Sequence, residues 1–375
     1  MKILLVSLGE HPAPGGVDTY IRMVEKALTA RGHDVNLLCY SNINMLPPES
    51  LTKIKNYHDL LNKQLDGKVP KMLINLELQR FAHKEMMSYF DLTSYDVIHS
   101  QSGITSRVAK EVYPNIPLVG TIHSCLFTES LYEGWAQNST EAELFRRYDY
   151  FAVNYPDKVI SISSIQDENM VTIPKEKHEI VYNAIDIERF NPNQKSKGIV
   201  RIATSGLLVY RKGYDLLLKA LAQLRDLNDE YELSIFGNGP EYEKLLSYSI
   251  QNKLPVTFHG YIERERLISE LGNYDIFIQP SRTEPFGYSV TEAMASGCVP
   301  ICSKVGGLQD QVIHLYNGLL FEPGNVRQLS DSIRLLIKNK DLRNKMREKA
   351  LEVVKQKFSL SVFGERLENI YSSLI

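Results

Sequence analysis

The run from Asp275 to Gly297 reads DIFIQPSRTEPFGYSVTEAMASG and carries the most informative pattern of the chain. Its first five residues form a short apolar run, which predicts a buried strand. The ten residues that begin at Gly287 predict a helix that stops at Gly297. Glu284 and Glu292 stand on either side of the point where this helix begins. A strand followed closely by a helix is the repeating unit of a parallel sheet.

This strand–helix unit indicates a ligand class. A helix N-terminus after a strand end presents free backbone N–H groups and a partial positive charge, which suit a phosphate. A nearby carboxylate can accept hydrogen bonds from sugar hydroxyls. A diphosphate joined to a polyol is the description of a nucleotide-sugar.

Short apolar runs alternate with helical patterns along the whole chain, which predicts an α/β fold with doubly wound, Rossmann-like parallel sheets. The strands expected in the first half are 3–7, 35–39, 96–99, 118–123, 158–162 and 179–182. Those expected in the second half are 201–205, 231–236, 256–259, 275–279 and 299–302. Helical patterns cover 51–90, 214–226, 240–251, 263–271, 287–296, 325–338, 340–356 and 360–373.

The length of 375 residues predicts two domains. The polar stretch 191–198 is expected to link a first domain, 1–190, to a second, 199–359. Ligands of open α/β sheets bind outside the carboxyl ends of the strands, so we expect both domains to face an inter-domain cleft.

The composition excludes several classes of function. The formal charge of −2, without a dense basic tract, gives no general attraction to nucleic acid. The four cysteines show no CxxC spacing and no histidine and carboxylate pair has metal-ligand spacing, so we expect reduced thiols and no protein-bound metal. The N-terminus is expected to be a first strand rather than a signal peptide, which favours a cytoplasmic protein. The mildly basic segment 51–90 leaves a solvated face and peripheral membrane contact both open.

Several loops contain candidate site residues in the second half. Arg211 and Lys212 are adjacent cations after an expected strand, and they could neutralise a diphosphate during bond cleavage. Gly206 lies in the same loop. Asn238, between two glycines at another strand end, could help to form a nucleobase pocket.

The first half offers a second group of candidates. Gly16 belongs to a glycine loop between the first strand and its helix, where backbone amides can approach an anion. His99 and His123 end expected strands and are predicted to face the same cleft; of the two, His123 is the favoured substrate contact. Trp135 could stack on a sugar or face the acceptor, or belong to the core.

Taken together, these motifs resemble the retaining glycosyltransferases of family 4, which have the GT-B architecture. The resemblance covers nearly the whole chain. It rests on the segments Gly15-Gly16, Asn183-Ala-Ile-Asp186, Arg211-Lys212, Glu284 with Glu292, Gly306-Gly307, and Asn317 to Gly324. Asp310 departs from the family pattern, which has glutamate at that position.

The resemblance implies a role for each candidate. The first domain would bind the acceptor and the second the nucleotide-sugar donor, with the C-terminal helix, 360–375, packing back on the first domain. Glu284 would hold a hydroxyl of the donor sugar and Glu292 the ribose hydroxyls. The residues expected to contact the sugar and phosphates are Phe286, Gly287 and Tyr288 through their amides, and Arg211 and Lys212 through their charges.

The implied reaction is metal-independent transfer of a hexose-type sugar from a UDP- or GDP-linked donor with retention of configuration. A nucleotide-sugar epimerase or hydrolase on the same fold, and a non-catalytic nucleotide-sugar-binding protein, are the alternatives. The acceptor stays open among small molecules, lipids and glycans.

Overall fold

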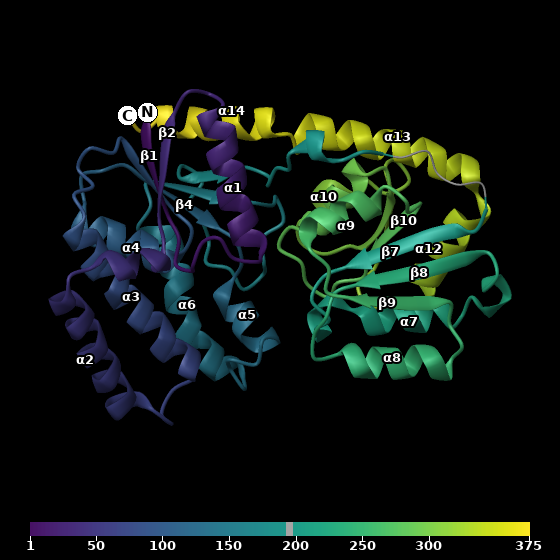
Figure 1. Cartoon of the computed structure of the whole chain (residues 1–375), viewed down its shortest axis with the longest axis horizontal. Coiled ribbons are helices and arrows are strands. Elements are labelled where there is room, and N and C mark those ends of the chain that lie inside the picture. The colour runs from purple at the N-terminus through teal and green to yellow at the C-terminus, as the bar shows by residue number, and fades with distance from the viewer. Residues whose placement is uncertain (193–197) are drawn as a thin grey trace. The chain divides into compact units, whose positions relative to one another are not determined.

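The computed structural model describes residues 1–192 and 198–375 and divides the chain into two compact units. Unit 1 consists of residues 1–162, 166–182 and 363–375, and unit 2 of residues 163–165 and 183–362. Residues 193–197 of the expected linker lie outside the described residues. Figure 1 shows the elements of each unit.

Unit 1 is built on a six-stranded sheet with the order β2-β1-β3-β4-β5-β6, in which every pairing is parallel. Its strands are β1 Lys2–Val6, β2 Asp34–Leu38, β3 Val97–Ser100, β4 Leu118–Ile122, β5 Lys158–Ser161 and β6 His178–Ile180. The strand order reverses between β1 and β3. Because crossover connections are right-handed, this reversal places helices on both faces of the sheet.

The helices of unit 1 fall into two packed groups (Figure 1). One consists of α2 Pro48–Leu65, α3 Lys71–Tyr89, α4 Gly103–Val112, α5 Leu126–Tyr132 and α6 Ser139–Asn154. The other consists of α1 Gly16–Thr29 and the C-terminal helix α14 Leu360–Ser372. The Tyr20 ring of α1 meets Phe363 of α14 edge-on, with 5.5 Å between the ring centroids.

A buried chain of hydrogen bonds connects α14 to the centre of this sheet. His99, at 0% exposure, shares one hydrogen bond of 2.7 Å with the Tyr371 hydroxyl and another of 2.7 Å with Thr121 Oγ1. The Thr121 hydroxyl lies 3.0 Å from the hydroxyl of Tyr20. Burial lowers the pKa of His99 to about 3, so its imidazole is neutral at pH 7.

Unit 2 repeats the plan, with the strand order β12-β11-β10-β7-β8-β9 and parallel pairings throughout. Its strands are β7 Val200–Ser205, β8 Tyr231–Phe236, β9 Val256–Gly260, β10 Ile276–Gln279, β11 Val299–Ser303 and β12 Leu319–Phe321. One helix group contains α7 Tyr214–Leu221, α8 Tyr242–Gln251 and α12 Val326–Lys338. The other contains α9 Arg264–Leu271, α10 Tyr288–Ala295 and α13 Lys340–Lys357, and the short α11 Leu308–Gln311 contacts α10.

The expected α/β fold is confirmed, and each expected strand is present within two residues of its expected bounds. Strand β12, Leu319–Phe321, was not predicted. The helical pattern over 51–90 is two helices instead of one. Gly67, at φ 71°, and Pro70, directly before α3, account for the break.

Candidate donor-sugar site in unit 2

The two loops with the strongest sequence signals follow neighbouring strands. β7 pairs with β10, and the strand order of unit 2 reverses between them. The loop after β7 contains Arg211 and Lys212, and the loop after β10 contains Glu284. The carboxyl ends of strands at such a reversal are where doubly wound sheets bind ligands. The fold therefore brings these predicted site residues to one edge of one sheet.

Lys212 and Glu284 form a largely buried ion pair. The Lys212 ammonium donates to Glu284 Oε2 at 2.6 Å, and the two side chains are 13% and 7% exposed. The Ser281 hydroxyl donates to the same oxygen at 3.3 Å and accepts a hydrogen bond of 2.7 Å from Gln279 Nε2. Among the described residues, both of these bonds go to Oε2, and the second oxygen, Glu284 Oε1, takes part in neither.

Two glycines permit the close approach of these loops. Gly213 follows the cation pair at φ 72°, and a Cβ there would lie 2.0 Å from the carbonyl oxygen of Pro280. Gly306, after β11, has φ 39°, and its Cβ would lie 2.1 Å from the carbonyl oxygen of Glu284. A side chain at either position would push a site loop out of place.

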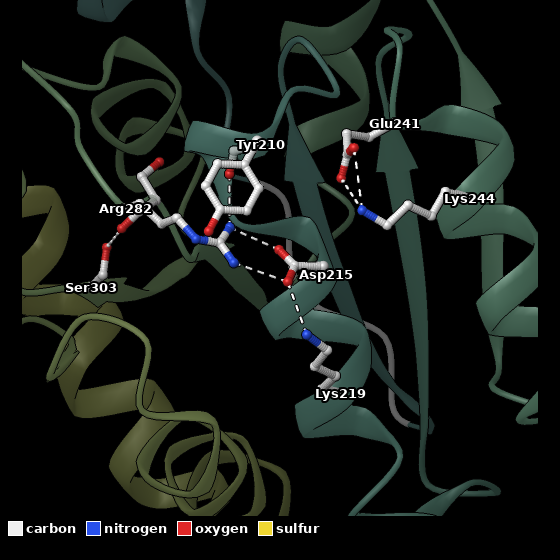
Figure 2. Close-up of polar contacts among 8 residues, drawn as sticks. Tyr210, Asp215, Lys219, Glu241, Lys244, Arg282 and Ser303 are labelled. Atoms are coloured by element: carbon white, nitrogen blue, oxygen red, sulfur yellow. Dashed lines mark hydrogen bonds and ion pairs between the residues drawn. The ribbon is translucent and has the colours of Figure 1, made fainter. Parts of the chain in front are cut away.

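Arg282 ties the same loops together (Figure 2). Its guanidinium forms a two-point ion pair with Asp215 of α7, at 2.8 and 2.9 Å, and donates to the carbonyl oxygen of Tyr210 at 2.7 Å. The guanidinium also lies over the Tyr210 ring, 3.9 Å from its centroid. The Arg282 backbone amide donates to the carbonyl oxygen of Arg211 at 2.7 Å. One residue of the β10 loop thus fixes the two peptide groups that precede Lys212.

The helix after this loop begins at Tyr288, and Gly287 precedes it at φ 94°. The first amides of a helix have no intrahelical acceptor, so this end of α10 can donate to an anion. Gln311 holds the turn in place, since its side-chain amide donates to the carbonyl oxygen of Phe286 at 2.5 Å. The Phe286 ring is buried, so only its backbone is suited to a ligand contact.

Glu292 lies one turn further along α10 and is held by Arg264, the first residue of α9. Arg264 donates from Nε and Nη2 to the same oxygen, Glu292 Oε1, at 3.1 and 2.5 Å. The Glu292 side chain is 7% exposed. Burial raises the pKa of its carboxyl, and the positive charges of Arg264 and Arg189 oppose that rise.

The remaining predicted donor contacts in unit 2 lie in the neighbouring loops. The Gly206 amide donates to the carbonyl oxygen of Phe236 at 2.9 Å, which joins the loops after β7 and β8. The side chain of Asn238 is exposed, and its Oδ1 accepts from the Gly239 amide at 2.8 Å.

Asp310, the position that departs from the family pattern, is a buried anchor. Its carboxylate accepts hydrogen bonds from the Ser163 hydroxyl at 2.7 Å, from the Ser164 amide at 2.8 Å, and from the Ser164 hydroxyl. Its role in this structure is to hold residues 163–165 to unit 2.

Gly16 and His123 belong to unit 1, so the structure describes them separately from the site in unit 2. Gly16 is the first residue of α1, and the loop before it folds around Asp18, whose Oδ1 accepts from the Ala13 amide at 2.8 Å. His123 shares a 2.9 Å hydrogen bond with Gln101 and meets the Tyr20 ring edge-on at 4.8 Å. Burial lowers the pKa of His123 to about 4.

One expectation about unit 1 requires correction. His99, expected to face a cleft, is fully buried, and both of its ring nitrogens are occupied by Tyr371 and Thr121. Trp135, for which a sugar contact and a core position were both open, is half-buried and packs against the cluster formed around Phe145, with ring centroids 6.1 Å apart.

The sequence reasoning missed Arg264 and Arg282. Arg282 stands two positions before Glu284, so a signal was available there. Nothing in the sequence connects Arg264 to a glutamate 28 positions later.

Two family models match the chain. The model "Glycosyltransferase Family 4" matches residues 14–189, and the model "Glycosyl transferases group 1" matches residues 186–353. Together with the two-sheet fold and the paired glutamates, these matches show that the chain belongs to the family 4 glycosyltransferases of GT-B fold and is an enzyme of that type.

Individual proteins agree with this assignment. The chain is 25% identical to an uncharacterized glycosyltransferase of Methanocaldococcus jannaschii over 99% of this chain and 98% of that protein. Its fold matches sucrose-phosphate synthase from Thermosynechococcus elongatus, with a TM-score of 0.76, 19% identity, and coverage of 100% and 98% of the two chains. It also matches Anabaena HepE in complex with UDP-glucose, with a TM-score of 0.68, 18% identity, and coverage of 99% and 100%.

Two features are absent from residues 1–192 and 198–375. No helix there is long and apolar enough to cross a membrane. No group of three or more histidine, cysteine, aspartate or glutamate side chains there is arranged to hold a metal ion.

Proposed function

We propose that the enzyme transfers a hexose-type sugar from a UDP- or GDP-linked donor to an acceptor hydroxyl, with retention of configuration and without a protein-bound metal. The observation that carries this proposal is the Lys212–Glu284 pair at the strand reversal of unit 2. A cation for the diphosphate and a carboxylate for the sugar hydroxyls stand side by side, next to a helix N-terminus that suits phosphate. HepE, a protein of the same fold, was crystallised with UDP-glucose.

In the proposed reaction, the bond from the anomeric carbon to the β-phosphate oxygen breaks while the acceptor oxygen attacks from the same face. The acceptor proton passes to the leaving phosphate oxygen. Arg211 and Lys212 offset the charge that develops on the diphosphate, which is the role that a divalent cation would otherwise take. Glu284 orients the sugar, and Glu292 orients the ribose.

The unit 1 residues Gly16 and His123 are proposed to contribute to donor and substrate binding. Gly16 would offer its backbone amide to the donor, and His123 would offer a neutral imidazole to the substrate. Gly206, Asn238 and the 286–288 segment are proposed to surround the nucleotide and phosphates.

Incubation with UDP-glucose, UDP-galactose, UDP-N-acetylglucosamine and GDP-mannose, with and without EDTA, tests the proposal. We expect slow release of free nucleotide from one donor without acceptor, and no effect of EDTA. Interconversion of the sugar without nucleotide release would instead indicate an epimerase. Tight binding with no turnover, even with a panel of polyol, lipid and glycan acceptors, would indicate a binding protein.

A further inference from the structure

Arg264 makes an unusual contact with Glu292. Both hydrogen bonds that Arg264 donates to Glu292 go to one oxygen, Oε1, whereas a guanidinium facing a carboxylate squarely would bond both oxygens. Among the described residues, Oε2 of Glu292 accepts no side-chain or backbone hydrogen bond. Arg264 therefore orients the carboxylate through one oxygen and leaves the other available to a ligand donor.

The charges around Glu292 also depend on this arginine. The carboxyl is buried, and burial favours its protonated form. Arg264 and Arg189 favour the charged form, whereas Glu265 opposes it. Arg189 is itself paired with Glu265, so its effect is shared between two carboxylates. Arg264 is the cation that contacts Glu292 directly.

We propose, on the basis of the function proposed above, that Arg264 is a positioning residue that orients ionised Glu292 to recognise the ribose of the donor. In this proposal Arg264 contacts Glu292 and acts on the nucleotide only through that residue. The chain would thus distinguish ribonucleotides from 2′-deoxyribonucleotides through two residues of different helices, α9 and α10.

The test compares the binding of UDP and 2′-deoxy-UDP by calorimetry, or of GDP and 2′-deoxy-GDP if the donor panel selects GDP. A hydroxyl that donates to a charged acceptor corresponds to about tenfold to a hundredfold in affinity, so the wild-type ratio of dissociation constants should be in that range. In Arg264→Gln, we expect weaker binding of the ribonucleotide and little change for the deoxynucleotide, so the ratio falls to about threefold or less. Arg264→Lys should retain part of the ratio because it keeps the charge and one donor.

Arg266→Gln is the matched control, because Arg266 lies in the same helix and is exposed. It should keep the wild-type ratio. A purely structural role of Arg264 would weaken both nucleotides equally and leave the ratio unchanged, which would overturn the proposal. A melting temperature for each variant separates lost recognition from lost folding.

A pH series adds a second readout. Without Arg264, protonation of Glu292 should begin at a higher pH, since only Arg189, shared with Glu265, still opposes the effect of burial. As the pH is lowered, the ratio of dissociation constants should therefore begin to fall at the same pH or a lower pH in Arg264→Lys than in Arg264→Gln. Titration of the phosphates affects both nucleotides and cancels in the ratio.

Glu292→Gln separates this inference from the function on which it depends. If that variant keeps the wild-type ratio, Glu292 does not read the ribose and the proposed donor site is wrong. If it loses the ratio while Arg264→Gln keeps it, the donor site stands and only the role of Arg264 fails.

Discussion

The Lys212 ammonium lies 2.6 Å from Glu284 Oε2, although 72 positions separate the two residues in the chain. The ion pair offsets the cost of burying each of the two charges. The two side chains are also proposed to bind different parts of the donor. Under the proposed function, donor binding would let Lys212 turn toward the diphosphate and Glu284 toward sugar hydroxyls, and the pair would then serve both stability and catalysis.

The first prediction concerns that pair. Lys212→Met leaves a buried carboxylate without its cation, so we expect a loss of about 2–4 kcal/mol in stability and about a hundredfold in turnover. Lys212→Met combined with Glu284→Gln should recover most of the stability and none of the activity. Urea unfolding and nucleotide release measure the two effects. A double variant no more stable than Lys212→Met would show that the two charges do not compensate each other.

The second prediction concerns the clamp in Figure 2. Arg282→Gln removes the two-point contact with Asp215 and the bond to the Tyr210 carbonyl, so Lys212 is displaced. Displacement of a catalytic group by about 1 Å can cost about a hundredfold, and we expect kcat to fall about 10- to 100-fold. Asp215→Asn should have a similar effect, and the double variant should be little worse than either single one.

Lys244→Gln provides the control for this experiment. Lys244 pairs with Glu241 in the same view, but its side chain is 68% exposed. An exposed pair of this kind contributes little, so neither kcat nor stability should change measurably. Equal losses in Lys244→Gln and Arg282→Gln would contradict a specific role for the clamp.

The third prediction uses two glycines with left-handed backbone. A Cβ at Gly306 would lie 2.1 Å from the Glu284 carbonyl oxygen, whereas one at Gly324, φ 77°, meets nothing within 4 Å. Gly324→Ala should cost only the strain of the left-handed conformation, about 1–2 kcal/mol, with full activity. Gly306→Ala should lower the melting temperature further and strongly reduce nucleotide release. Equivalent behaviour of the two variants would mean that the loop of Glu284 tolerates displacement.

The fourth prediction concerns His123, whose pKa burial lowers to about 4. The unfolded chain takes up this proton near pH 6.5 and the folded chain only near pH 4. The free energy of unfolding therefore falls as the pH is lowered from 6.5 to 4. His123→Gln removes the effect, and the stability difference between wild type and variant should change by up to about 1.4 kcal/mol per pH unit between pH 6.5 and 4.

Activity gives a separate reading of the same group. Because the pKa of His123 is about 4, its imidazole stays neutral as the pH falls through 6.5. Any inflection of kcat/KM near pH 6.5 should therefore be the same in the wild type and in His123→Gln. The disappearance of such an inflection in the variant would show that the imidazole is accessible to protons in the working enzyme.

The local sequence pattern was sufficient to locate most strands and helices, because the periodicity of apolar residues can be read from consecutive positions. The pattern around Glu284 and Glu292 indicated the helix, and the resemblance indicated the family, and both are confirmed; the ligand class inferred from the same pattern stays a prediction. Burial could not be read in the same way. His99 and His123 end neighbouring strands with similar sequence signals, yet His99 is 0% exposed and occupied by Tyr371, which lies 272 positions away.

Local sequence patterns were enough to predict the alternation of strands and helices and the parallel α/β fold, because these depend on short-range periodicity; that the loop residues suit a nucleotide-sugar stays a prediction. Which charges meet depends on the three-dimensional fold. Parallel pairing of β7 with β10 brings Lys212 to Glu284, and the packing of α9 beside α10 brings Arg264 to Glu292. Contacts between distant segments depend on strand order and helix packing, which no local stretch of residues encodes.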